Sequence, residues 1–352
     1  MNQDFLAALE AIEKDRGISK DTLFDAIEAA LISAYKRNFS TSSNVKIYID
    51  RDSGEIKVYK CLTVVDNVER PQQEISYEEA RSINTAYKIG DVLEKEVTPK
   101  NFGRIAAQTA KQVVIQRIRE AERELIYEEY VDRLDDIVTG VVQRFEQKNV
   151  IINLGKTEAI LPPPEQIPRE HLRQGDRIKA YITEVKKTTK GPQIIVSRSH
   201  PGLLKRLFEL EVPEIYDGIV ELKAVAREAG GRSKIAVWTR DKNIDPVGAC
   251  VGPRGSRVQT VVNELKGEKV DIVEWSEDPQ VYIAHALSPA KVIRVKTNES
   301  EKSAEVVVPD YQLSLAIGKE GQNARLAAKL TGWKIDITNE SATREDLNEE
   351  IN

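Results

Sequence analysis

The sequence predicts an α+β protein of several domains: an N-terminal α/β domain with a long linking helix, a small OB-fold β-barrel, and two tandem copies of one α/β module. Three observations carry this prediction. Helical and strand periodicities alternate over residues 1–130, short β-rich runs crowd residues 131–200, and one motif recurs within residues 201–340. The 352 residues allow two to four domains, and 40% hydrophobic with 31% charged residues is typical of a folded chain.

Composition excludes several classes of protein. Cys61 and Cys250 are the only cysteines, which excludes a disulfide-stapled secreted fold and favours the reducing cytoplasm. No apolar run approaches the roughly 18 residues of a membrane helix, so no membrane partner is expected. Residues 1–10 carry acidic Asp4 and Glu10 and no basic residue, unlike a signal peptide. The net charge of −5 does not indicate a nucleic-acid binder, so any RNA site must be local.

The N-terminal part of the chain predicts an α/β domain that ends in a long helix. Apolar residues at helical spacing predict two helices within residues 1–36. Alternating apolar residues on both sides of the turn at 52–54 predict a hairpin. Ser76 and Glu79 have capping-box spacing for a short helix. Helical spacing from Arg104 to Leu134 predicts a strut about 45 Å long between domains.

Residues 131–200 carry a net charge of +3 and predict a small closed barrel. The predicted strands are Ile137–Phe145, Val150–Leu154, Ala159–Leu161, Arg177–Val185 and Gln193–Ser197. OB-type barrels bind single strands through a basic groove and stacked aromatics. The two aromatics, Phe145 and Tyr181, are expected in the core, so phosphate contacts would dominate any RNA binding. The candidate basic side chains are Lys148, Lys156, Arg173, Lys186, Lys187, Lys190 and Arg198.

An internal repeat is the most informative feature of the sequence. A Gly-x-x-Gly loop occurs at 252–255 and again at 318–321, so the two loops lie 66 residues apart. Two β-rich runs precede each loop, and a helical stretch and a strand follow it. Each copy therefore predicts the order helix, strand, strand, helix, loop, helix, strand. A structural turn is the alternative for a single loop, but two copies in the same setting favour a shared function.

The chemistry of such a loop suits a nucleic-acid backbone. Glycine allows close approach and positive φ, and free N–H groups at the start of the following helix favour a phosphate. A hydrophobic residue before each loop, Val251 or Ile317, can line a groove for bases. Clamping about four nucleotides of single-stranded RNA in this way is the KH-domain mode. The candidate RNA-binding residues are Val251, Gly252, Pro253, Arg254, Gly255 and Arg257 in the first copy, and Ile317, Gly318, Lys319, Glu320, Gly321, Asn323 and Arg325 in the second.

The sequence contains none of the catalytic motifs considered below. Residues 155–157 resemble the end of a phosphate-binding P-loop, but Val150 stands where that motif needs glycine. The sequence has no HExxH, G-x-S-x-G, dinucleotide fingerprint or CxxC, and its three histidines are scattered. We therefore expect no enzyme activity, no metal and no cofactor. Trp238, Trp275 and Trp333 are expected to be packing residues.

Several stretches resemble the NusA family of bacterial transcription factors. They are residues 211–214, 232–237, 245–252, 314–323 and 326–337. The resemblance covers essentially the whole chain and is strongest over residues 200–340.

That resemblance implies a domain for each part of the chain. The implied domains are an RNA polymerase-binding domain at 1–130, an OB barrel of the ribosomal S-one type at 131–200, two tandem type II KH domains, the first at 201–276 and the second at 277–340, and an acidic tail at 341–352.

The resemblance also implies a function. Members are non-enzymatic elongation factors that dock near the RNA exit channel of bacterial RNA polymerase, hold nascent single-stranded RNA, and modulate pausing, termination and antitermination. We expect a cytoplasmic monomer that also interacts with other antitermination factors. The barrel lacks the usual stacking aromatics, and the sequence lacks the acidic C-terminal repeats of some members. The acidic tail is expected to be too short to mask the RNA site.

Two alternatives stay open at this point. A non-catalytic RNA-processing or ribonuclease-associated protein can join the same barrel to KH domains. A nuclease subunit of this kind would need a catalytic domain with clustered acidic or metal-binding residues, and this sequence shows none. A pure protein scaffold whose KH copies have lost RNA is the other. RNA binding by residues 200–340 would eliminate the scaffold.

Overall fold

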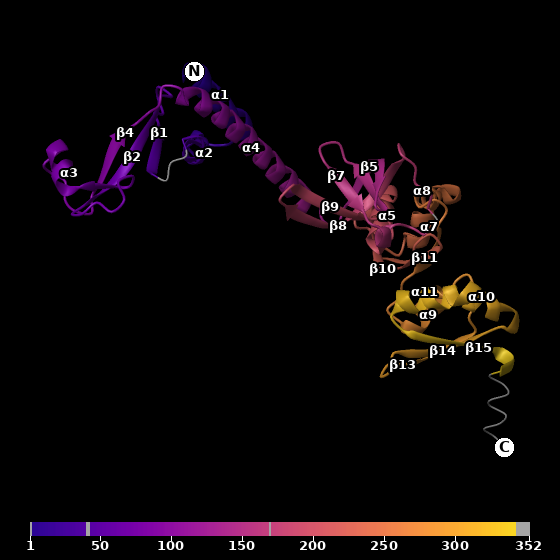
Figure 1. The fold of residues 1–352 in the computed structure, drawn as a ribbon. Coiled ribbons are helices and arrows are strands. Elements are labelled where there is room, and N and C mark those ends of the chain that lie inside the picture. Colours follow the sequence, from indigo (N-terminus) through magenta and orange to yellow (C-terminus); the bar gives the residue numbers. More distant parts are fainter. Residues whose placement is uncertain (1, 40–42, 169, 343–352) are drawn as a thin grey trace. The chain divides into compact units, whose positions relative to one another are not determined.

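The structure is a computed structural model that describes residues 2–39, 43–168 and 170–342 (Figure 1). The chain divides into two compact units, which meet between Leu125 and Ile126. The fold class predicted from the sequence, an α+β protein of several domains, is confirmed. The acidic tail predicted at 341–352 lies almost entirely outside the described residues.

The first unit packs helices on a four-stranded sheet. Its elements are α1 Asn2–Arg16, α2 Lys20–Asn38, β1 Asn44–Ile49, β2 Ile56–Val65, β3 Glu74–Ser76, α3 Tyr77–Ile83, β4 Val92–Glu96 and the first part of α4 Phe102–Val131. The strands β1 and β4 pair antiparallel with β2, and β3 pairs parallel with it. The predicted helices and hairpin are confirmed, and the Ser76 hydroxyl accepts a hydrogen bond from the Glu79 amide at the start of α3.

The core of this unit follows from the helical stripes. Leu23, Ile27 and Leu31 of α2 are fully buried against Ile47 of β1 and Phe102 of α4. The spacing of these α2 residues puts them on one face, so the helix buries a continuous stripe against the sheet.

The long helix α4 is two residues longer at its start and three shorter at its end than the range predicted from Arg104 to Leu134. The helix ends early because its last turn tightens: the Leu134 amide bonds to the Val131 carbonyl, three residues back instead of four. The Arg133 amide already bonds to the Tyr130 carbonyl in a tightened last turn.

The second unit begins with the predicted closed barrel, whose strands follow the order β5-β6-β7-β9-β8. Its strands are β5 Ile137–Glu146, β6 Asn149–Asn153, β7 Glu158–Leu161, β8 Arg177–Thr188 and β9 Gly191–Ser197. Aliphatic residues such as Ile152, Leu161 and Ile178 fill the interior. Tyr181 is buried as predicted, but Phe145 is 53% exposed and its placement in the core was wrong. Phe145 lies at the end of β5, beside the turn that contains Gln147, where the core does not reach.

Two modules of the same topology follow the barrel. The first comprises α5 Pro201–Glu211, α6 Pro213–Tyr216, β10 Val220–Glu228, β11 Arg232–Thr239, α7 Pro246–Val251, α8 Ser256–Glu264 and β12 Lys269–Glu274. The second comprises α9 Pro279–Ala286, β13 Arg294–Asn298, β14 Ser303–Val308, α10 Leu313–Ile317, α11 Gln322–Thr331 and β15 Lys334–Asn339. In each sheet the middle strand pairs antiparallel with the first strand and parallel with the third. The repeat predicted from the sequence is therefore a repeat in structure.

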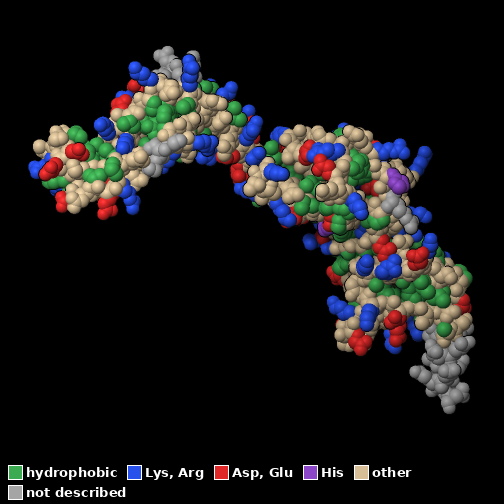
Figure 2. Space-filling view, in the orientation of Figure 1, with side chains coloured by type: hydrophobic (Ala, Val, Ile, Leu, Met, Phe, Trp, Pro, Cys, Tyr) green, Lys and Arg blue, Asp and Glu red, His purple; other side chains and the backbone are tan. Residues whose placement is uncertain are grey.

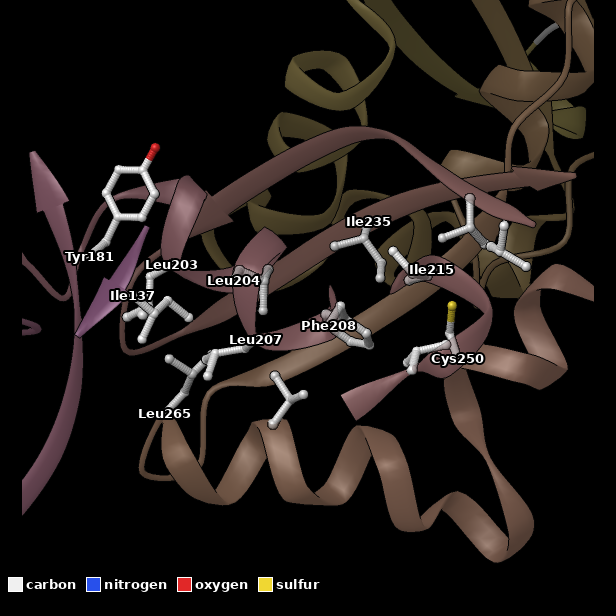
Figure 3. Close-up of a cluster of buried hydrophobic side chains, with 14 of the residues drawn as sticks. Ile137, Tyr181, Leu203, Leu204, Leu207, Phe208, Ile215, Ile235, Cys250 and Leu265 are labelled. Carbon is white, nitrogen blue, oxygen red and sulfur yellow. The ribbon is translucent and has the colours of Figure 1, made fainter. Parts of the chain in front are cut away.

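The two modules share packing as well as topology. One face of the first sheet packs on α5 and α8 around Leu204, Phe208 and Ile235 (Figure 3). The other face carries the small residues Ala226 and Ala236, which pack in one cluster with residues of α9 and α11 from the second module. Small side chains let these helices approach the sheet closely. The two Gly-x-x-Gly loops are thus held within one packed body.

Candidate nucleic-acid interface

The two Gly-x-x-Gly loops have the same backbone conformation. Gly252 and Gly318 have φ of 74° and 76°, each with ψ of 173°. The third residue of each loop, Arg254 or Glu320, is left-handed with φ of 55° or 54°. A sequence repeat that reproduces this backbone geometry indicates a loop that is built in the same way twice.

The first glycine of each loop is required by space as well as by backbone angle. A Cβ on Gly252 would lie 2.6 Å from Cγ of Arg257, and a Cβ on Gly318 would lie 2.8 Å from Cβ of Asn323. The residue five positions after each glycine therefore packs directly under the loop. Gly255 has no atom near its Cβ position, so the second glycine is required only by its left-handed φ of 78°.

The side chains under the two loops hold them by different bonds. The Arg257 guanidinium donates from Nη1 to the Ala249 carbonyl at 2.5 Å and to Glu214 at 2.9 Å. Asn323 is buried, and its Nδ2 donates to the carbonyls of Leu287 and Ala316, each at 3.0 Å. These two predicted site residues are therefore bonded inside the protein, and an RNA contact by either of them stays a prediction.

Arg325 also has a partner within the protein. Its Nε donates to Glu228 of the first module at 2.6 Å, and its Nη1 donates to the Glu320 carbonyl at 3.1 Å. The side chain is still 48% exposed. The structure thus brings Arg325 to the second loop, as predicted from the sequence, and pairs it with a carboxylate 97 residues away.

The loop tips face solvent. Pro253 and Arg254 are exposed in the first loop, as are Lys319 and Glu320 in the second. The hydrophobic residue before each loop is partly accessible, with Ile317 at 38%. Each loop also precedes a helix of nine or ten residues, whose first N–H groups favour an anion. Backbone donors and an apolar neighbour therefore occur together at both loops.

The basic residues of the barrel do not form one array. Lys156 bonds to Glu129 and Lys187 lies 4.5 Å above the ring of Tyr127, so both contact the end of α4. Lys186 pairs with Glu184 at 2.8 Å. Figure 2 shows Lys and Arg side chains interspersed with Asp and Glu on the visible face. Lys148 and Arg173 are exposed, in the turn after β5 and in the loop before β8, and RNA contact by these residues stays a prediction.

Arg198 was predicted among the basic side chains available to RNA, and that prediction was wrong. Its side chain is fully buried against Glu170, because it joins the barrel to the first KH module.

Lys190 lines a cavity in the barrel with a volume of about 580 Å³. The charges that line this cavity balance, because Arg144 and Lys190 stand against Glu146 and Glu158. Arg144 bonds to both carboxylate oxygens of Glu158 at 2.7 and 2.9 Å and also to Glu146. Hydrogen bonds from Arg144 hold the pKa of the Glu158 carboxyl below its ordinary value. This ion-paired cavity offers little net charge to a phosphate.

Trp275, Trp333 and Cys250 pack in or against the cores of the two modules. Trp275 and Trp333 pack against the core of the second module, as predicted, and Trp275 meets Trp238 edge to face with ring centres 6.0 Å apart. Cys250 of α7 is buried in the core of the first module, and burial raises the pKa of its thiol to about 12.

Residues 2–39, 43–168 and 170–342 contain neither a cluster of metal-ligating side chains nor a membrane-spanning helix. His, Cys, Asp and Glu side chains do not gather in threes as metal ligands do. No helix within those ranges is both long and apolar enough to cross a membrane.

Comparison with known domain families matches successive stretches of the chain. The matching descriptions are the NusA N-terminal domain over residues 4–124, the S1 RNA binding domain over 131–197, the NusA-like first KH domain over 198–275 and the NusA-like second KH domain over 279–345. Each Gly-x-x-Gly copy thus falls within a KH match.

Curated relatives extend the match over nearly the whole chain. The transcription termination/antitermination protein NusA of Halalkalibacterium halodurans is 64% identical, across 98% of this chain and 90% of that protein. The Bacillus subtilis protein of the same name is also 64% identical, across 98% and 93%. The Thermus thermophilus protein is 44% identical, across 100% and 93%. This chain belongs to the NusA family.

Membership of the NusA family confirms the resemblance and the domain order predicted from the sequence. The predicted class of function, a NusA-family transcription factor with an RNA-binding barrel and two KH domains, is confirmed with it. Sequence reasoning missed Glu214 and Glu228, which hold the two loops. No local motif indicates these two roles, because Glu214 and Glu228 each lie more than 40 residues in sequence from the arginine they bind.

Proposed function

We propose that this chain is an RNA-binding elongation factor that docks on bacterial RNA polymerase through its first unit and holds nascent single-stranded RNA on its two KH modules. Through these contacts it modulates pausing, termination and antitermination. The observation that carries this proposal is the repeated loop geometry in a chain 64% identical to NusA proteins. The chain acts in the cytoplasm as a non-catalytic monomer, alongside other antitermination factors.

In the proposed mode, each loop holds the RNA backbone and leaves the bases to the adjoining groove. Backbone N–H groups at the loop and helix start bind phosphate, and Val251 or Ile317 contacts bases. Because both loops belong to one packed body, a single strand can extend from one to the other. The barrel contributes phosphate contacts through exposed lysines, with Phe145 as its exposed aromatic side chain.

The first unit suits a protein partner better than RNA. Residues 1–130 carry a net charge of −4. An apolar cavity of about 270 Å³ opens between α1 and α4, lined by residues that include Phe5, Ile12 and Val114. Apolar grooves of this kind bind protein side chains, whereas RNA backbones bind cationic surfaces. These features support polymerase docking by this unit.

The proposed domain boundaries follow the same division of labour. Residues 1–130 dock on polymerase, 131–200 form the barrel, and 201–276 and 277–340 form the KH domains. The alternative of an RNA-processing protein is not favoured, since the matched relatives are named as transcription factors.

The test compares the full chain with residues 126–352, which retain the barrel and both KH cores. RNA affinity is measured by fluorescence anisotropy and pause lifetime by transcription on a template with one strong pause site. We expect the shortened chain to bind RNA like the full chain and to leave the pause unchanged. Normal pause lengthening by the shortened chain would contradict polymerase docking by the first unit.

A further inference from the structure

One carboxylate of the first KH module holds the helix that follows the loop of the second. Glu228, at the end of β10, accepts hydrogen bonds from Nε and Nη2 of Arg325 at 2.6 and 3.1 Å. It also accepts one from Nε2 of Gln322 at 2.9 Å. Gln322 is the first residue of α11 and follows Gly321 directly. Glu228 thus fixes the segment in which the loop becomes a helix.

Arg325 carries this restraint into the loop itself. Its Nη1 donates to the carbonyl of Glu320 at 3.1 Å. Glu320 is left-handed, with φ of 54°, a conformation that is unfavourable for a residue with a side chain. A chain of bonds therefore runs from Glu228 through Arg325 to the strained residue at the loop tip.

The first loop lacks this arrangement. Gln259 occupies the position that corresponds to Arg325 and bonds to Asn263 on its own helix, at 2.9 Å. The first loop is held instead by Arg257 and Glu214, both within the first module. The dependence on a neighbouring module is specific to the second loop.

Glu228 is itself held in place by a buried cluster. Its neighbour Arg227 bonds to Glu268 at 2.9 and 3.0 Å, with side chains 1% and 0% exposed. Arg227 also donates to the His200 carbonyl at 2.7 Å, and the Gly230 amide donates to Glu268 at 3.0 Å. The hairpin that carries Glu228 therefore cannot shift without breaking buried bonds.

We propose that Glu228 is a positioning residue for RNA binding: it holds Arg325 and Gln322 so that the second Gly-x-x-Gly loop is preformed for a phosphate. This inference rests on the proposed RNA-binding function of that loop. Hydrogen bonds from Arg325 hold the pKa of Glu228 below its ordinary value, so the bonds are charge-assisted at neutral pH. Because a preformed loop is already ordered, less of the RNA-binding free energy is lost in ordering it.

Whether removal of the Glu228 charge weakens or tightens RNA binding distinguishes a positioning role from simple repulsion. A carboxylate near RNA repels phosphate, so removing its charge would tighten binding if repulsion were its only role. Positioning predicts weaker binding on the same change. Glu305 of β14 provides the matched control, because its side chain is 70% exposed in the second module and its ion pair with Lys296 is long at 3.6 Å.

The experiment measures binding of the full chain to a random-sequence single-stranded RNA about 20 nucleotides long, long enough for two sites of about four nucleotides. We expect Glu228→Gln to weaken binding about threefold to tenfold, the effect of losing charge-assisted hydrogen bonds. Glu228→Asp keeps the charge on a shorter side chain that cannot reach both partners, so it should weaken binding too. Glu305→Gln should leave binding unchanged or slightly tighter. Unchanged or tighter binding by Glu228→Gln would overturn the proposal.

Two altered backgrounds make the test specific to the second loop. With Lys319→Asp and Glu320→Asp already present, Glu228→Gln should cause no further loss. With Pro253→Asp and Arg254→Asp present instead, it should cause its full loss. A general loss of stability would weaken binding in both backgrounds and would overturn the positioning role. If the second-loop change alone leaves affinity unchanged, the proposed function of that loop fails, and this inference fails with it.

Discussion

Arg198 is buried against Glu170, with its Nη2 2.5 Å from Oε1 and its Nε 2.8 Å from Oε2. The two side chains are 0% and 3% exposed. The same guanidinium donates to the carbonyls of Lys179 in the barrel and Glu264 in the first KH module, at 2.5 and 3.0 Å. One buried cation thus joins the barrel to the module that follows it.

Removing this cation should destabilise the second unit strongly. Arg198→Met leaves Glu170 buried without its partner, a change that typically costs about 3–5 kcal/mol. Arg144→Met provides the control, since Arg144 forms a bidentate pair with Glu158 in which the side chains are 41% and 45% exposed. This substitution should lower the free energy of unfolding by no more than about 1 kcal/mol. Urea unfolding followed by circular dichroism measures both free energies. Equal losses would contradict the structural role of Arg198.

The two glycines of the second loop should differ in their tolerance of a side chain. Gly318, with φ of 76° and ψ of 173°, occupies a region open essentially to glycine alone, and its Cβ would meet Asn323 at 2.8 Å. Gly321, with φ of 74° and ψ of 13°, is in the left-handed region that asparagine tolerates. We expect Gly318→Asn to cost about 1–3 kcal/mol and Gly321→Asn less than about 1. Thermal unfolding measures the difference, and an equal cost for both changes would show that the loop geometry is wrong.

The two thiols should react at very different rates. Burial raises the pKa of Cys250 to about 12, so at pH 8 roughly one thiol in ten thousand is ionised. Cys61 is only partly buried. Iodoacetamide at pH 8 should modify Cys61 first and Cys250 only after unfolding in urea, as mass spectrometry would show. Labelling of both at the same rate in the folded protein would contradict the burial of Cys250.

The raised pKa also fixes the direction of a stability effect. An unfolded thiol ionises near pH 8.5, whereas folded Cys250 stays protonated to about pH 12. Its contribution to the free energy of unfolding is therefore fully present below pH 8.5 and is lost as the pH rises toward 12. The alkaline loss of stability should be smaller in Cys250→Ala than in the parent chain.

The sequence predicted what depends on local pattern. The order of elements around each Gly-x-x-Gly loop follows from periodicity, glycine chemistry and repetition, and all of it appears in the structure. The exposure of Phe145 depends on where the core of the barrel stops, and the early end of α4 at Val131 depends on where its last turn tightens. Neither feature leaves a periodic signal.

The roles of charged residues were the hardest to predict. Arg198 and Arg257 belong to basic sets that suit RNA, yet each is held by a carboxylate from another element. Their partners Glu170 and Glu214 lie 28 and 43 residues away. The type of side chain shows that a residue can bind phosphate, but only the tertiary structure shows whether a carboxylate has already bound it.

The central claim, that the two loops hold RNA, is tested most directly by placing carboxylates where phosphates are expected. The changes are Pro253→Asp with Arg254→Asp, Lys319→Asp with Glu320→Asp, and both pairs together in the full chain. Asp tolerates the left-handed backbone of the third loop position, and the loop tips are exposed, so the fold should persist. Each pair should weaken single-stranded RNA binding at least about tenfold, or 1.4 kcal/mol, with thermal unfolding unchanged. Unchanged RNA affinity in the chain that carries all four substitutions would contradict the account.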